Sequence, residues 1–223
     1  MAPPPPPPCN WQRDATVFEV DGQDDANGHP SAVGGGEYHH HFDPTGLRLQ
    51  LGDDGASHSP ILGFAYDGFP VYGPWSFDNT DGTGGVVRIE SSYELRTGLR
   101  PPPSATSPGG PFDGSYLEDW RYVAGLGHLD EHNGRFAETP EYPNGTYAYY
   151  VTLDANLDTM YPHIVGPDYY GVVIQANLDQ TVTVPQNAVE YPISEPATLA
   201  LLGLGTLTLI ARRLPRRSNR ECV

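Results

Sequence analysis

The residues best suited to chemistry are three consecutive histidines, His39, His40 and His41, which follow the glycines at 34–36. In an extended segment successive side chains point to opposite faces, so His39 and His41 would share one face about 7 Å apart. Two such imidazoles can bind one metal ion, and imidazole is typical of zinc, copper, iron and nickel sites. A third ligand would have to come from elsewhere in the chain. The alternative is an exposed histidine run in a glycine-rich loop that binds metal only adventitiously.

Other common catalytic patterns are missing from the sequence. It contains no Gly-x-Ser-x-Gly, and the glycine-rich segment 81–85 is not followed by the Lys-Ser/Thr of a phosphate-binding loop. Cys9 and Cys222 stand at opposite ends of the chain, so we expect no internal disulfide framework. Metal-assisted oxidation or hydrolysis is the enzymatic alternative that these patterns leave open.

Short strands and long turns are expected to position the histidines. The chain has 26 glycines and 24 prolines in 223 residues, which predicts many turns and excludes long helical bundles. No window sustains a helical period, and 116–123 suits a short helix or a strand equally. The predicted strands are 16–20, 47–51, 61–66, 86–89, 146–153, 169–175 and 181–184. We therefore expect an all-β fold, a sandwich or irregular barrel, with 61–66, 146–153 and 169–175 as central strands.

Charge divides the chain into two parts. Residues 1–195 carry 7 arginines against 27 acidic residues, whereas 196–223 carry 5 arginines and one acid. The acidic part would repel phosphate backbones, which argues against nucleic-acid binding. The uncharged run 197–211 precedes the arginines and predicts a membrane helix whose basic end is cytoplasmic, with the acidic body outside. Its length of about 22 Å makes spanning marginal, and a buried core helix is the alternative.

The C-terminal segment resembles the PEP-CTERM sorting signal. Glu195-Pro196 precedes the apolar run, and an arginine cluster beginning with Arg212 and Arg213 follows it, while Ser194 replaces the first proline of the family motif. The resemblance implies an exported protein of polymer-producing Gram-negative bacteria that is processed by a transpeptidase-like exosortase. Such a protein is held at the envelope or released after processing. Because residues 1–10 show no secretion signal, we expect upstream coding sequence or an unconventional route.

A second set of motifs runs through the chain in a single order. Its members lie at 36–41 (GEYHHH), 58–63, 66–74, 91–96, 112–114, 118–119, 133–136, 139–149 and 166–171. Together they resemble the YHYH domain family, which is secreted or surface-associated and has no settled activity. The resemblance implies metal binding at the segment that gives the family its name.

The same resemblance makes His58, at the start of a His-Ser-Pro match, the preferred third ligand beside His39 and His41. Copper or zinc is the expected ion. The weaker candidate ligands are His40, His128, His132 and Asp67.

Three of these weaker candidates are departures from the family pattern. His40 replaces the second tyrosine of the name motif, and His128 and His132 stand where the family more often has Asp and Cys. Asp67 is expected either to bind backbone amides in a turn or to orient a ligating imidazole.

These observations predict an exported, surface-tethered domain that binds a transition metal and acts as an envelope or extracellular-matrix component. A metal-dependent enzyme with an open histidine site and a glycan-binding module that uses its tyrosine rings are the two alternatives. The expected partners are the membrane, an exosortase-like enzyme and extracellular polysaccharide. The expected segments are a proline-rich segment 1–10, the β domain 11–185, a linker 186–194, the anchor 195–217 and a tail 218–223.

Overall fold

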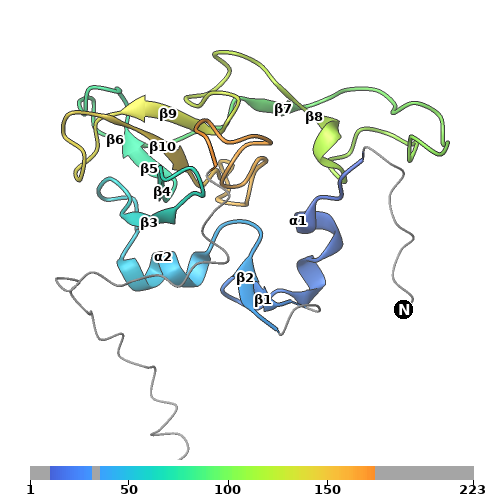
Figure 1. The fold of residues 1–223 in the computed structure, drawn as a ribbon, viewed down its shortest axis with the longest axis horizontal. Helices are drawn as coiled ribbons and strands as arrows, with labels where there is room; N and C mark the ends of the chain where they lie inside the picture. Colours follow the sequence, from blue (N-terminus) through green and yellow to red (C-terminus); the bar gives the residue numbers. More distant parts are fainter. Residues whose placement is uncertain (1–10, 32–35, 174–223) are drawn as a thin grey trace, which may run out of the picture. The chain divides into compact units, whose positions relative to one another are not determined.

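A computed structural model describes residues 11–31 and 36–173 of the chain. This part is mostly β, with small sheets and few helices (Figure 1). The described elements are, in chain order, α1 (Ala15–Phe18), the 3-10 turn η1 (Val20–Gly22), β1 (Gly28–Pro30), β2 (Tyr38–His40), α2 (Thr45–Leu51), β3 (Ile61–Phe64), β4 (Pro70–Tyr72), β5 (Trp75–Phe77), β6 (Val86–Arg88), β7 (Tyr93–Leu95), η2 (Leu117–Asp119), β8 (Trp120–Tyr122), β9 (Gly134–Ala137) and β10 (Thr146–Tyr150).

The largest described sheet has four strands in the order β3-β4-β10-β9, and the central strand β10 is parallel to β4 and antiparallel to β9. Alternate residues of β10 point to opposite faces, and both faces are buried. Ala148 and Tyr150 pack in one core cluster with Tyr72, while Tyr147 and Tyr149 pack in a second cluster with Val71. Burial on both sides explains why this strand contains almost only apolar and aromatic residues.

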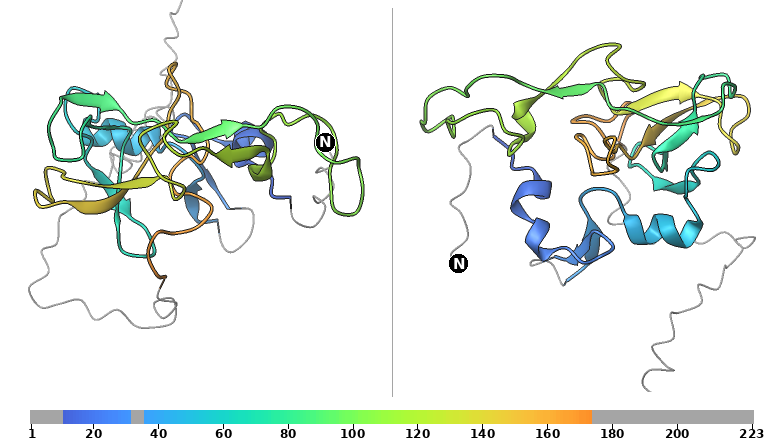
Figure 2. Two further views of the ribbon diagram at one scale, coloured as in Figure 1. Left: turned by 90° about the horizontal axis from the view of Figure 1, so that it is seen from above. Right: turned by 180° about the vertical axis from the view of Figure 1, so that it is seen from behind.

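Three two-stranded ribbons complete the described sheets: β1–β2, β5–β6 and β7–β8. In the ribbon β1–β2 the strands are antiparallel, and His29 lies directly opposite His39. Figures 1 and 2 show this ribbon beside α1 and η1. Asp24 fastens the ribbon, because its carboxylate accepts hydrogen bonds from the Gly28 amide at 3.1 Å and the Tyr38 hydroxyl at 2.9 Å. A Cβ at position 28 would lie 2.2 Å from that hydroxyl, so a larger residue there would displace the Tyr38 ring.

Two predicted strands are helical in the structure, and those predictions were wrong. Residues 16–20 lie in α1 and η1, because the Asp14 carboxylate caps the helix by accepting the Thr16 amide at 2.9 Å. Residues 47–51 lie in α2, which ends at Gly52 with a left-handed φ of 72°. The leucines of 47–51 alternate, but Leu49 is 74 % exposed, so the alternation does not mark a half-buried strand.

The other predicted elements have mixed outcomes. The strand predictions at 61–66, 86–89 and 146–153 are confirmed in shortened form as β3, β6 and β10, although β3 lies at the sheet edge. Residues 116–123 contain η2 and then β8, and residues 169–173 form no strand. The predictions at 174–175, 181–184 and 197–211 lie outside the described residues. Within 11–31 and 36–173, no helix has the length and apolar character needed to cross a membrane.

Candidate metal centre

Three imidazoles cluster beside the ribbon β1–β2, and the carboxylate of Glu19 lies next to two of them. The Nε2 atom of His41 lies 3.1 Å from Nε2 of His39 and 3.1 Å from Nε2 of His29. The Oε2 atom of Glu19 lies 3.1 Å from Nε2 of His41 and 3.4 Å from Nε2 of His29. Among the described residues, the three histidines form the one cluster whose ligand atoms could share a metal ion, all lying within 4.8 Å of one another.

Local structure explains this convergence. Antiparallel pairing sets His29 opposite His39, and their rings lie 4.5 Å apart between centroids. His41 follows His39 by two positions and lies on the same side, with a ring separation of 4.8 Å. Glu19 is the C-terminal cap of α1, so the helix brings its carboxylate to the ribbon.

The spacing fits one bound ion. Ligand atoms at about 2.0–2.1 Å from a tetrahedral metal are separated from one another by about 3.3 Å. Four of the six pairs of these atoms are 3.1–3.4 Å apart, close to that value. The Nδ1 of His39 lies 3.0 Å from the Glu37 carbonyl oxygen, so an Nδ1–H that donates there leaves the Nε2 lone pair free for a metal.

Electrostatics favours the neutral form of His41. Burial lowers the pKa of its imidazole below the usual value, the nearby His39 and His29 lower it further, and Glu19 opposes the shift. A neutral imidazole is the form that binds metal. Without a cation, the single Nε2 of His41 must accommodate three close polar neighbours with at most one proton.

A small cavity of about 210 Å³ borders this centre, and His41, Tyr161 and His163 are among the residues in its wall. The Nε2 of His163 lies 3.0 Å from an oxygen of Asp14. Burial alone would raise the pKa of Asp14, but the hydrogen bond and charge of His163, together with hydrogen bonds from Thr16, outweigh that effect and hold it below its usual value.

His58, the third ligand preferred from the sequence, lies in the core and not in this cluster. His58 is only 8 % exposed, and this burial lowers the pKa of its imidazole. Its Nδ1 lies 2.8 Å from the carbonyl oxygen of Ser59, and its Nε2 lies 3.0 Å from the hydroxyl of Ser76. Both ring nitrogens therefore have protein partners, which is typical of a packed histidine.

The weaker histidine candidates are also separate from the cluster. The Nε2 of His40 is buried and has no hydrogen-bond partner among the described residues. The Nδ1 of His128 accepts a hydrogen bond from the Glu90 amide at 3.0 Å. The Nδ1 of His132 donates to the Asp168 carbonyl at 3.0 Å.

Asp67 has the first of its two expected roles, that of binding backbone amides. Its carboxylate accepts hydrogen bonds from the amides of Gly171 at 2.9 Å and Phe69 at 3.4 Å. The Tyr149 hydroxyl donates to the same carboxylate at 2.5 Å. Asp67 therefore links a turn to the central strand β10, and its hydrogen-bond partners among the described residues include no histidine.

Sequence reasoning missed His29 and Glu19. His29 enters the cluster through strand pairing, and the signal available for it was the glycine-rich segment 34–36 between two short extended runs, which is typical of a hairpin. Glu19 gave no such signal, because the segment around it was interpreted as a strand.

Comparison with known families agrees with both resemblances. Residues 6–162 match the family described as YHYH protein. This range includes the three clustered histidines and Glu19. Residues 192–217 match the PEP-CTERM protein-sorting motif, which implies export to the cell surface and processing by an exosortase. No curated protein and no solved structure matches the chain. Since the first match covers more than half of the chain, the protein belongs to the YHYH family and carries a C-terminal PEP-CTERM sorting motif.

Proposed function

We propose that this protein is an exported, cell-surface protein that binds one transition-metal ion through His29, His39, His41 and Glu19. The observation that carries the proposal is the cluster of three imidazoles, in which Nε2 of His41 lies 3.1 Å from Nε2 of both His29 and His39. The Oε2 atom of Glu19 lies 3.1 Å from the same Nε2 atom of His41.

We propose zinc or copper as the ion. Three imidazole nitrogens suit zinc, copper, iron and nickel, and a carboxylate oxygen is a common fourth ligand of zinc. Glu19 would fill the fourth position of a tetrahedral ion. Hydrolytic zinc sites keep that position open for water, so the presence of Glu19 supports metal binding as an envelope or matrix component over metal-dependent hydrolysis.

Location forms the second half of the proposal. The sorting motif at 192–217 supports a chain whose acidic body lies outside the cell and whose segment 195–217 is the anchor. In this arrangement the β domain is 11–185 and 186–194 is the linker. An exosortase would act at the motif, where Ser194 replaces the usual first proline.

Metal analysis tests the proposal directly. The full chain is purified without a histidine tag, analysed for bound metals, and titrated with zinc and with copper against a chelator of known affinity. We expect one ion per chain, and a loss of affinity of at least about a hundredfold in the double variant His39→Ala/His41→Ala.

The matched control for this titration is His128→Ala/His132→Ala, which removes the same number of imidazoles outside the cluster. It should bind metal as the unmodified chain does. Equal affinities of the unmodified chain and the His39→Ala/His41→Ala variant would overturn the proposal.

A further inference from the structure

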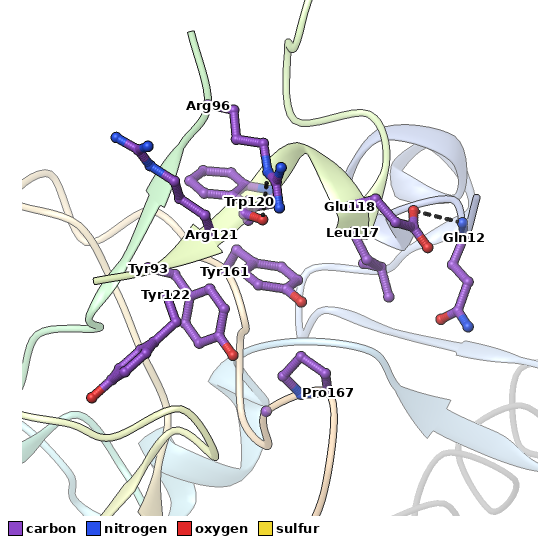
Figure 3. Close-up of a pocket in the computed structure, with 11 residues that line it drawn as sticks. Gln12, Tyr93, Arg96, Leu117, Glu118, Trp120, Arg121, Tyr122, Tyr161 and Pro167 are labelled. Atoms are coloured by element: carbon purple, nitrogen blue, oxygen red, sulfur yellow. Dashed lines mark hydrogen bonds between the residues drawn. The ribbon is translucent and has the colours of Figure 1, made fainter. Parts of the chain in front are cut away.

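A second, larger cavity of about 680 Å³ lies along the ribbon β7–β8 (Figure 3). Its wall contains four aromatic rings and two arginines, together with the polar residues Gln12 and Glu118. The rings are Tyr93, Trp120, Tyr122 and Tyr161, and the arginines are Arg96 and Arg121. Its volume lies within the range of small-molecule sites, and its mixture of flat rings with a few polar groups is typical of such sites.

The four rings hold one another in place. Tyr161 stacks on Trp120 at a centroid distance of 5.4 Å and an interplanar angle of 7°. Tyr93 contacts Tyr161 edge-on at 5.1 Å and Tyr122 at 5.8 Å, and strand pairing places Tyr93 directly opposite Tyr122. A wall of packed rings loses little side-chain entropy when a ligand binds, which preserves affinity.

Two polar groups in this wall have no hydrogen-bond partner among the described residues. The Nε1–H of Trp120 is enclosed, so a ligand does not reach it. Tyr161 lines the cavity, and its hydroxyl can pair with a hydroxyl oxygen of a ligand in place of water.

Arg96 supplies a positive charge to the cavity wall. Its Nε donates to the Trp120 carbonyl at 3.2 Å, and no carboxylate of the described residues lies within ion-pair distance of it. Arg121 differs, because Glu94 pairs with its guanidinium. Glu118 lines the same cavity and the body is acidic, so the attraction of an anionic ligand would be local: Arg96 can form a charge-assisted hydrogen bond with one acidic group.

We propose that this cavity binds an acidic carbohydrate, with a uronate ring against the aromatic wall and its carboxylate on Arg96. The C–H face of a pyranose packs on an aromatic ring, while its hydroxyls can pair with Tyr161, Gln12 and Glu118. This ligand class uses all three features of the wall: the rings, the unpaired hydroxyl and the free guanidinium. The site is separate from the four candidate metal ligands, none of which lines it.

A matched pair of ligands tests the proposal. The full chain is titrated calorimetrically with a uronic-acid tetrasaccharide and with the same tetrasaccharide after its carboxylates have been reduced to alcohols. We expect the acidic form to bind at least about tenfold more tightly, because a charge-assisted hydrogen bond is lost on reduction. Absence of binding by both forms, or equal binding of the two, would overturn the proposal.

Arg96→Gln should remove the preference for the acidic tetrasaccharide, so that the variant binds both forms equally. It should bind the acidic form about tenfold more weakly than the unmodified chain does. The control is Arg121→Gln, which removes one positive charge from the same cavity but from an arginine already paired with Glu94. It should retain the preference for the acidic form. A loss of preference in Arg121→Gln equal to that in Arg96→Gln would refute recognition by Arg96.

Stacking is tested at Tyr122, whose ring is only partly buried. Tyr122→Ala should weaken binding of both tetrasaccharides about tenfold, whereas Tyr122→Phe, which keeps the ring, should bind as the unmodified chain does. Circular dichroism of each variant shows whether the fold is retained. Unchanged binding by a folded Tyr122→Ala variant would contradict stacking on this ring.

Discussion

Replacing His29 with alanine should abolish stabilisation of the protein by metal, whereas replacing His58 should leave that stabilisation intact. The two histidines differ in their surroundings. His29 has its Nε2 3.1 Å from that of His41, whereas both nitrogens of His58 have partners in the core. The comparison therefore separates the ligand that the structure favours from the ligand that the sequence favoured.

The size of the effect follows from binding linkage. An ion present at 100 times its dissociation constant raises the free energy of unfolding by about 2.7 kcal/mol. For a domain of this size, that increase corresponds to a rise in melting temperature of about 5–10 °C. His29→Ala should lose this rise, whatever stability the metal-free variant itself loses.

His58→Ala should have the opposite pattern. Loss of a buried imidazole with two hydrogen bonds should lower the free energy of unfolding by about 1–3 kcal/mol, because Ser76 loses a buried partner. The rise in melting temperature on adding metal should nevertheless remain. Scanning calorimetry of the full chain with a chelator and then with zinc measures both quantities. A metal-induced rise that persists in His29→Ala and disappears in His58→Ala would refute the reasoning.

Three further predictions concern stability and location. Asp14→Ala should lower the free energy of unfolding by about 1–2 kcal/mol in urea titrations, because it removes the cap on Thr16. The pKa of Asp14 in the folded state is below its usual value, so its contribution to the free energy of unfolding is present above about pH 4 and should vanish as the pH falls through the folded-state pKa. A stability difference between Asp14→Ala and the unmodified chain that grows on acidification would contradict this. Arg100→Gln should cost about 3–5 kcal/mol, because it leaves the fully buried Asp119 carboxylate without its cation, and a loss below about 1 kcal/mol would contradict that role. Deletion of 192–217 should abolish retention at the cell surface, measured by fractionation and external protease, and retention of the truncated chain would contradict the assignment.

The sequence predicted the central strand β10 but not its buried neighbour β4. Thr146–Tyr150 combines aromatic content with β-propensity, and its burial inside the sheet makes these local preferences agree with the tertiary structure. Residues 47–51 show the opposite case. Their alternating leucines lie on a surface helix, and the more reliable signal was Gly52, whose left-handed conformation ends that helix.

At the metal centre, local spacing predicted one part and non-local pairing determined the rest. His39 and His41 are two positions apart, so the side-chain period of an extended segment was enough to place them together. His29 reaches the cluster through the register of β1 against β2, which a single sequence does not specify. His58 was preferred because of a motif, but burial and two hydrogen bonds explain its presence equally well.

Tyr161 forms part of two cavity walls, the aromatic one along β7–β8 and the smaller one that His41 borders. A carbohydrate that shifts this ring would alter the surroundings of His41, and an ion held by His41 would alter the ring's freedom to move. Any such coupling is reciprocal: the factor by which metal changes carbohydrate affinity must equal the factor by which carbohydrate changes metal affinity. The protein's affinity for acidic carbohydrate outside the cell would then depend on the concentration of free metal there.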